Sequence, residues 1–324
     1  MRIGQNPAKF VKEVAKPARV TVAVLNYIPF LSGFYAEALD VLKVTLDSIR
    51  VNADLPFDLL VFDNASCEEV RQYLLDEHQA GRIQFMILSE KNLGKGGAWN
   101  VILAGAPGEV IVYTDSDAYF YPGWLSRSLQ LLETFPNVGM VTARPFRTKP
   151  ELYTQTVAWG RATEGVTVEE GHLVPFETFR EFDLSLGQSE EEIKAHFEAS
   201  QDVRLTYQGV TAYAGASHWQ FMAYKTVIQS FLPFQMDRPM GQVKQLDERM
   251  NAAGYLRLMV SDPLAMNMSN TLRNVPGVKA PAGSASSGAQ GGKKKGSTFL
   301  FDLPPVRRAL LWLYDSIFRW YYDR

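Results

Sequence analysis

Short apolar runs alternate with amphipathic stretches through the first 145 residues of the chain. The runs are nearly continuous in hydrophobicity, which is typical of strands buried on both faces of a sheet. We expect strands at 20–25, 57–63, 83–88, 109–115 and 138–143. The stretches between them keep helical spacing at 38–50, 68–80, 98–106 and 124–133. This alternation predicts an α/β fold, with a mostly parallel sheet flanked by helices and joined by right-handed crossovers.

Polar residues follow the expected strands at the edge where a ligand should bind. In open α/β sheets, ligands bind outside the carboxyl ends of the strands. The polar clusters are Asn26-Tyr27, the DNAS segment 63–66, the segment 89–100 and the DSD segment 115–117. Four such clusters at one edge predict a binding site there.

The DSD segment is the most informative of these clusters. Because side chains alternate along a strand, Asp115 and Asp117 point to the same side. Two neighbouring carboxylates repel each other unless a cation lies between them. Mg²⁺ is usually held by one or two carboxylates together with substrate phosphates. A solvated acidic turn is the alternative, but the position at the end of a buried strand favours a metal with a phosphorylated ligand.

The neighbouring clusters suit a nucleoside diphosphate. Asp63 and Asn64 can bind a base edge or ribose hydroxyls, or form an Asx turn that caps the following helix. The NLGKGG segment opens a helix, where free amides and Lys95 would attract an anion. This segment is not a Walker loop, because no Ser or Thr follows the lysine, and it is not a dinucleotide fingerprint, because the G-x-G-x-x-G spacing is missing. A glycine-rich connection that allows close packing is the alternative.

Taken in order, the segments VTVAVLNY, VFDNAS, KNLGKGGAWN and YTDSD resemble the nucleotide-sugar half of family 2 glycosyltransferases. The resemblance implies a GT-A-like, Rossmann-like sheet and a bound Mg²⁺ or Mn²⁺. It implies that Asp63 contacts the base, that Asp115 lies near the ribose and that Asp117 holds the metal. Asn92 and Asn100 would shape the base and ribose pocket. The candidate donor-binding residues are Asn26, Tyr27, Asp63, Asn64, Asn92, Lys95, Asn100, Asp115 and Ser116.

Three segments of the second half carry further likeness to the same family. The segment 211–225 is expected to form a strand, a small-residue turn and another strand. It resembles the floor of the family's donor–acceptor cavity, which makes His218 and Trp219 candidate acceptor contacts. The alternatives are a hydrogen-bonding role for His218 and a core position for Trp219.

The segment L-x-x-R-x-x-x-x-G-Y, at 246–255, resembles the helix that presents the family's catalytic carboxylate. Asp247 and Glu248 are therefore candidates for the general base, with Asp237 a more distant one. An ordinary surface position, paired with Lys244 or Arg249, is the alternative. After the next strand, Asn267 stands where the family often has a histidine that reaches the metal, and it is a candidate metal ligand.

Composition narrows the class of protein. The chain has 324 residues, 46% of them hydrophobic, and a net charge of −2, which gives no support for nucleic-acid binding. The single cysteine, Cys67, excludes an intramolecular disulfide and fits a reducing compartment. We find no signal peptide and no apolar run long enough to span a bilayer. We therefore expect a cytoplasmic protein, with peripheral contact at the inner membrane face as a further option.

We expect a GT-A-like domain at 1–275, with a donor half at about 18–145 and an acceptor half at about 146–275. The segment 149–208 lacks a clear rhythm, and its acidic run SEEE is expected to be a solvated face or loop. A flexible linker is expected at 276–297 and an amphipathic C-terminal helix at 298–324. Three lysines, Lys293 to Lys295, precede this aromatic and arginine-rich helix, which suits a membrane interface. Docking on the chain's own domain or in a homodimer is the alternative.

We therefore expect a metal-dependent enzyme that moves a sugar from a UDP- or dTDP-linked donor to an acceptor hydroxyl, and the resemblance implies that the transfer proceeds with inversion. The acceptor is a glycan, a lipid or a protein. One alternative is a metal-dependent nucleotidyltransferase, which also uses carboxylates at strand ends. The other is a non-catalytic protein that binds sugar nucleotides or glycans.

Overall fold

A large mixed sheet forms the centre of the chain. The computed structural model describes residues 4–235, 243–273 and 275. The strands are β1 (Val20–Asn26), β2 (Phe57–Asn64), β3 (Phe85–Ser89), β4 (Val110–Asp115), β5 (Ala118–Phe120), β6 (Val138–Thr142), β7 (Thr167–Gly171), β8 (Asp202–Tyr207), β9 (Val210–Ala214), β10 (Gln220–Tyr224), β11 (Leu256–Val260) and β12 (Ala265–Asn267). The helices are α1 (Ala38–Asn52), α2 (Glu68–Gln79), α3 (Gly94–Gly105), α4 (Trp124–Thr134), α5 (Thr154–Ala162), α6 (Phe176–Ser185), α7 (Glu190–Ala199), α8 (Lys225–Gln229) and α9 (Lys244–Ala252).

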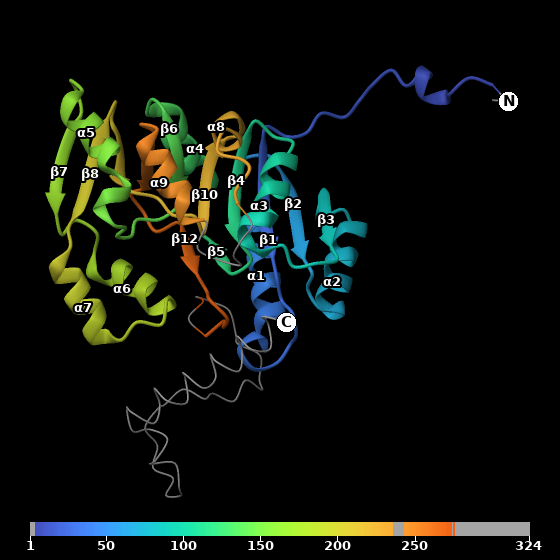
Figure 1. The fold of residues 1–324 in the computed structure, drawn as a ribbon, viewed down its shortest axis with the longest axis horizontal. Helices are drawn as coiled ribbons and strands as arrows, with labels where there is room; N and C mark the ends of the chain where they lie inside the picture. The colour runs from blue at the N-terminus through green and yellow to red at the C-terminus, as the bar shows by residue number, and fades with distance from the viewer. Residues whose placement is uncertain (1–3, 236–242, 274, 276–324) are drawn as a thin grey trace, which may run out of the picture. The chain divides into compact units, whose positions relative to one another are not determined.

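The strand order of the large sheet is β3-β2-β1-β4-β10-β6-β11-β9-β8-β7 (Figure 1). Strands β3, β2, β1 and β4 are parallel, so their carboxyl ends share one edge. Strand β10 lies antiparallel between β4 and β6, and β11 is parallel to β6. The remaining neighbours are antiparallel, and β12 pairs with β5 in a small second sheet. The expected α/β class is confirmed. The block of four parallel strands comes from the N-terminal half of the chain.

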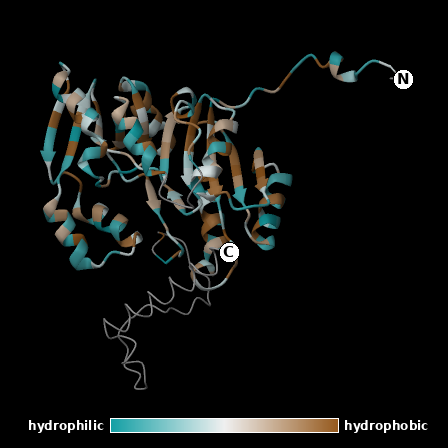
Figure 2. Cartoon of the chain, in the orientation of Figure 1, coloured by the Kyte–Doolittle hydropathy of each residue, from teal (hydrophilic) through white to brown (hydrophobic). Residues whose placement is uncertain are grey.

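Both faces of the sheet are covered by helices, and the core lies in two layers. Every residue of β1 is buried. Val22 and Val24 belong to the layer that includes residues of α1 and α4, whereas Ala23 and Leu25 belong to the layer with α3 and α9. Burial on alternate sides explains why the strands are hydrophobic along their length, as Figure 2 shows for the central strands.

The strands and helices expected in the first 145 residues are all present. The largest difference is at α3, which begins at Gly94 rather than at residue 98. Its first turn contains three glycines, which have low helix propensity and therefore hide the helix start from the pattern. Gly96 and Gly97 are buried there, in the turn that follows β3.

The second half is more regular than its sequence indicates. The expected strand, turn and strand at 211–225 are confirmed as β9 and β10, and the expected helix that stops at Gly254 is α9. The expected irregular segment contains α5, β7, α6, α7 and β8. The acidic run begins α7, where Ser189 and Glu192 form a reciprocal capping box. Glu191 and Glu192 are exposed, so the expected solvated face is present, but it begins a helix and does not form a loop.

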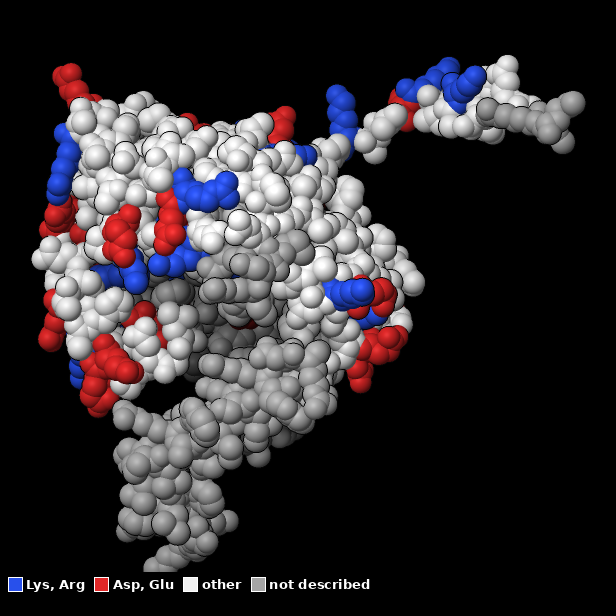
Figure 3. All heavy atoms as spheres, in the orientation of Figure 1, with Lys and Arg blue, Asp and Glu red and all other residues white. Residues whose placement is uncertain are grey.

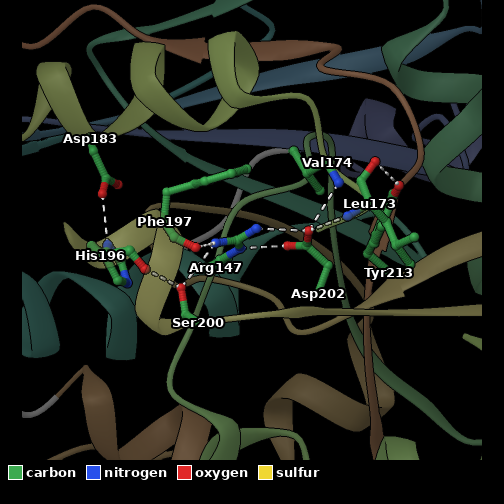
Figure 4. A network of polar contacts seen from close by, with 9 residues as sticks. All are labelled: Arg147, Leu173, Val174, Asp183, His196, Phe197, Ser200, Asp202 and Tyr213. Carbon is green, nitrogen blue, oxygen red and sulfur yellow. Dashed lines mark hydrogen bonds and ion pairs between the residues drawn. The ribbon is translucent and has the colours of Figure 1, made fainter. Parts of the chain in front are cut away.

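The buried side chain of Arg147 ties the end of α7 and the segment before α6 to the sheet (Figure 4). Arg147 donates two hydrogen bonds to Asp202, and further bonds to Phe197 O and Ser200 Oγ. Asp202 also accepts from the backbone amides of Leu173 and Val174, at 2.9 Å each. Because both side chains of the pair are buried, the contact is shielded from water and salt. The region of α6 and α7 is therefore a braced part of the fold.

The predicted linker, C-terminal helix and lysines Lys293 to Lys295 lie outside the described residues, as does Asp237. The predicted boundary between donor and acceptor halves stays a prediction. None of the helices in the described ranges has the length and hydropathy needed to cross a bilayer.

Candidate functional site

Asn26 and Asp63 meet at the carboxyl ends of β1 and β2. Asn26 Nδ2 donates to Asp63 Oδ1 and to Ser66 Oγ, at 2.9 Å each. Asp63 Oδ2 accepts from Ser66 N at 3.2 Å, which closes a turn, but Asp63 does not cap α2, because the residue that precedes this helix is Cys67 and no side chain caps it. All three residues are buried. Since each carboxylate oxygen can accept more than one hydrogen bond, Asp63 is held in one orientation and can still accept from a ligand.

Asn64 ties the end of β2 to the glycine-rich segment before α3. Its Nδ2 donates to Asn92 Oδ1 at 2.9 Å, and its Oδ1 accepts from Leu93 N at 2.8 Å. Asn92 Oδ1 also accepts from Gly94 N at 2.8 Å. Asn64 and Asn92, both expected to bind the sugar donor, therefore contact each other. Together they set the shape of the glycine-rich segment.

Lys95, on the first turn of α3, reaches Asp115 at the end of β4. Its Nζ lies 2.7 Å from Asp115 Oδ2, while Tyr113 OH donates to Asp115 Oδ1 at 2.6 Å. Burial, and then the Asp115 charge, raise the pKa of Tyr113 well above its usual value, so the hydroxyl stays a donor. Sequence reasoning did not single out Tyr113, although its position two residues before Asp115 places it on the same side of the strand.

Asp117 lies just beyond β4, between the two sheets. Burial, and then the charge of Asp115, raise its pKa to about 7, and Lys95 opposes this shift. Within the described residues its carboxylate has no hydrogen bond or ion pair with another residue, and its backbone carbonyl accepts from Met268 N at 2.7 Å. Because the Asp117 carboxylate is desolvated and lies near that of Asp115, a cation bound between them would be stabilised.

The chemistry of Asp115 and Asp117 fits a divalent ion such as Mg²⁺ or Mn²⁺, because hard cations take oxygen ligands. The described part of the chain contains no group of three or more His, Cys, Asp and Glu side chains that could hold a metal. A cation at this pair would thus draw its other ligands from amide oxygens, phosphate and water, as hard cations commonly do. Asn267 is close in the fold, since β12 places it opposite Ala118, and its Oδ1 accepts from Ser269 N at 2.9 Å.

The remaining residues expected to bind the sugar donor are Tyr27, Ser116 and Asn100. Tyr27 is half-buried after β1. Ser116 contributes its carbonyl to Thr45 Oγ1 at 2.9 Å, which anchors the DSD turn to α1. Asn100 exchanges two hydrogen bonds with the backbone of Phe234, at 2.6 and 2.8 Å. The polar atoms of Asn100 thus hold a loop, and its nucleotide-binding role stays a prediction.

The floor loop, which we define as residues 215–219, connects β9 to β10 and is fixed along its length. Gly215 N donates to Arg257 O, Ser217 N to Thr142 Oγ1, and Asp115 N to Trp219 O, each at 2.9 Å. Gly215 has φ +125°, a region that L side chains rarely adopt. The ring of Trp219 is buried, 5.9 Å from that of Phe182, which favours the core position over stacking on an acceptor.

Asp247 is buried on α9, so the surface position considered for it is wrong. Its Oδ2 accepts from His218 Nδ1 at 2.8 Å, and its Oδ1 accepts from Arg257 Nη2. Arg257 is also buried, and donates to Leu152 O at 2.7 Å and to Ala216 O at 2.6 Å. Glu248 differs: it is exposed and pairs with Lys244 at 3.1 Å, which agrees with the surface alternative.

A cavity of about 800 Å³ lies beside Asp117, between α6 and the segment 266–271. Its wall reaches the DSD turn, because Met268 N donates to the backbone carbonyl of Asp117. Its lining mixes apolar side chains such as Phe34 and Leu184 with polar ones such as Glu181 and Asn267. Figure 3 shows a hollow in this face, with acidic side chains gathered over α6 and α7.

Part of the chain matches a known protein family. The description "Glycosyl transferase family 2" belongs to the family whose sequence profile matches residues 33–180. That range includes Asp63, the glycine-rich segment and the DSD turn. A curated relative, the uncharacterized glycosyltransferase alr2836 of Nostoc sp., is 24% identical over 122 residues. The aligned part is 38% of this chain and 34% of that protein, so the chain spans about a third of the relative's length.

Two solved structures have a similar arrangement of elements. The mannosyltransferase PcManGT of Pyrobaculum calidifontis, in complex with GDP-Man and Mn²⁺, is 17% identical, with a TM-score of 0.45 over 77% of this chain and 56% of that one. Residues 1–349 of S. aureus TarS, in complex with UDP-GlcNAc, are 14% identical, with a TM-score of 0.44 over 76% of this chain and 56% of that one.

Proposed function

Residues 33–180 match glycosyl transferase family 2, and from this premise we propose that the chain moves a sugar from a nucleotide-diphosphate donor to an acceptor hydroxyl. The observation that carries the proposal is the pair Asp115 and Asp117, which lies at the carboxyl edge of a GT-A-like sheet that also holds Asp63. This edge is where the topology of an α/β sheet favours a ligand.

The proposed donor is a UDP- or dTDP-sugar. Uracil and thymine each carry a ring N–H, which suits the acceptor-only carboxylate of Asp63; guanine carries one too, so the donor screen compares all three bases. Lys95 supplies positive charge at the start of α3, near the expected diphosphate. A bound Mg²⁺ or Mn²⁺, held by Asp117 and Asp115 with Asn267 as a further ligand, would stabilise the departing diphosphate. The transfer is proposed to be a single displacement with inversion.

The acceptor is proposed to extend into the cavity beside Asp117. Amide, hydroxyl and carboxylate groups in its wall can bind sugar hydroxyls, and Phe34 offers an exposed ring for the apolar face of a sugar. The reacting hydroxyl of the acceptor would approach the sugar donor from the side of this cavity. A glycan acceptor, free or carried on a lipid or protein, fits this lining.

We expect a thermal-shift screen to identify the donor. UDP or dTDP, at about a hundred times its dissociation constant with Mn²⁺, should raise the melting temperature by several degrees. GDP should raise it less, and EDTA should remove the shift. Product analysis then follows with the matching sugar nucleotide. Release of the nucleoside diphosphate supports the proposal, whereas pyrophosphate formed from a nucleoside triphosphate would indicate a nucleotidyltransferase. Binding without any turnover would indicate a binding protein.

Peripheral membrane contact through the C-terminal segment is a separate proposal that rests on the sequence. Polybasic residues contribute about 1 kcal/mol each near an anionic bilayer, and Lys293 to Lys295 precede an aromatic segment. The full chain should therefore co-sediment with phosphatidylserine vesicles, and a chain lacking Ser297 to Arg324 should not. Co-sedimentation of both chains, or of neither, contradicts the proposal. A smaller oligomer on gel filtration of the shortened chain would instead assign the segment to a homodimer contact.

A further inference from the structure

His218 is the exposed member of a buried polar cluster. Its Nδ1 lies 2.8 Å from Asp247 Oδ2, and its side chain is 33% exposed, whereas that of Asp247 is 4% exposed. A carboxylate only accepts hydrogen bonds, so Nδ1 must carry the proton. The neutral imidazole then has its free lone pair on Nε2, which forms no hydrogen bond within the described residues.

Asp247 itself is poorly placed to reach a substrate. One of its oxygens is engaged by His218 and the other by Arg257, a buried guanidinium that also donates to two backbone carbonyls. Two neighbours of Asp247 offer no free carboxylate in its place. Glu248 is exposed and paired with Lys244, and Val243, just before α9, is apolar. The group of this cluster that can meet a substrate is therefore the imidazole.

The floor loop places His218 at the sheet edge that holds the carboxylates. Trp219, the next residue, accepts a hydrogen bond from the backbone amide of Asp115. Ser217, the preceding residue, is bonded to Thr142 on β6. With both neighbours and its own Nδ1 fixed, His218 has little freedom to move, and such preorganisation is what a proton-transfer group requires.

We propose that His218 is the general base of the transfer and that Asp247 is its positioning residue; this rests on the proposed function. In the step, the acceptor oxygen bonds to the anomeric carbon while that carbon's bond to the diphosphate oxygen breaks. The electron pair leaves on the diphosphate, and the acceptor proton passes to His218 Nε2. Asp247 holds the imidazole in the competent tautomer and stabilises the imidazolium that forms.

The chain contains a matched control for this pair. His196 Nδ1 lies 2.9 Å from Asp183 Oδ2, with side chains 40% and 6% exposed (Figure 4). The geometry and burial resemble those of His218 and Asp247, but this pair joins α6 to α7 and forms no hydrogen bond to the floor loop within the described residues. A variant at His196 thus reports what the loss of a buried histidine–carboxylate contact does to the fold alone.

The test compares His218→Gln with His196→Gln, with release of nucleoside diphosphate from a panel of UDP- and dTDP-sugars as the readout. Water serves as the acceptor, so no acceptor need be known. His218→Gln should lower kcat by roughly two to four orders of magnitude with an unchanged donor KM and an unchanged thermal shift with UDP and Mn²⁺. His196→Gln should keep wild-type kcat. Similar kcat values for the two variants would overturn the assignment.

Two further variants separate a chemical role from a structural one. Imidazole added to His218→Ala should restore part of the lost kcat, which no structural contact would do. Asp247→Asn should lower kcat, and the double variant with His218→Ala should be no slower than His218→Ala alone, because Asp247 acts through the imidazole. Additive losses, or no rescue by imidazole, would overturn the inference. A wild-type chain that binds UDP but releases nothing from any donor would overturn the proposed function, and the inference with it.

Discussion

The Asp117→Asn variant is expected to melt at a higher temperature than the wild-type chain at pH 8, while losing metal-dependent nucleotide binding. Desolvation and the charge of Asp115 raise the pKa of Asp117 from 3.8 to about 7. A carboxyl group with a raised folded-state pKa stabilises the fold below its unfolded pKa, and that stability is lost as the pH rises through the folded pKa. At pH 8 the ionised Asp117 therefore destabilises the metal-free chain, and asparagine removes that cost.

The pH dependence makes this prediction specific. At pH 4 Asp117 is largely protonated in the folded chain, so the difference in melting temperature should shrink. At pH 8 Mn²⁺ with UDP should stabilise the wild type and leave Asp117→Asn nearly unchanged, and donor turnover should fall by about a hundredfold or more. Asp262→Asn, a change at an exposed carboxylate, is the control and should match the wild type in each measurement. An equal response of Asp117→Asn to Mn²⁺ would remove Asp117 from the metal site.

Replacement of Arg257 by methionine should cost about 3–5 kcal/mol of unfolding free energy, because it leaves the buried carboxylate of Asp247 without its cationic partner. Burial lowers the pKa of Arg257, and Asp247 opposes that shift, so each charge depends on the other. The backbone carbonyls of Leu152 and Ala216 also lose their donor. The measurement is urea unfolding at equilibrium, compared through the midpoint at constant slope.

The matched control is Arg204→Met, which removes an arginine from a more exposed ion pair with Glu169. That pair should be worth about 0–1 kcal/mol. A second variant, Arg257→Met with Asp247→Leu, should recover part of the loss, since no buried charge then remains unpaired. Equal destabilisation by Arg257→Met and Arg204→Met would mean that the buried cluster is solvated or otherwise compensated.

The N-terminal half of the fold could be predicted from the sequence because its signals are local. A strand buried on both faces produces a continuous apolar run, and helices that cover a sheet produce a clear stripe. Elements with a weak local signal were not predicted correctly. The start of α3 was placed too late because its first turn is rich in glycine, and α6 and α7 were not expected because their segment lacks a clear hydrophobic pattern.

Some residues of the candidate site could likewise be predicted from local sequence, and others could not. Asp63, Asp115 and Asp117 could be found because each follows directly from a recognisable strand. The cluster of His218, Asp247 and Arg257 could not, because its members come from a loop, a helix and a strand that meet only in the folded chain. Nothing local marks Arg257 as buried: it sits within the apolar strand LRLMV, where an arginine usually signals an exposed edge.

The position of β10 has a consequence for how the chain can fold during synthesis. Strand β4, which carries the DSD turn, has β1 on one side and β10 on the other. When the ribosome has released only the first 145 residues, β4 and β6 have no strand between them, and their hydrogen-bonding edges stay open. These edges are closed only when Gln220–Tyr224 emerges and inserts. The carboxylate site is therefore completed late, by a contact between distant parts of the chain, and a fragment that ends at residue 145 would expose edges that favour aggregation.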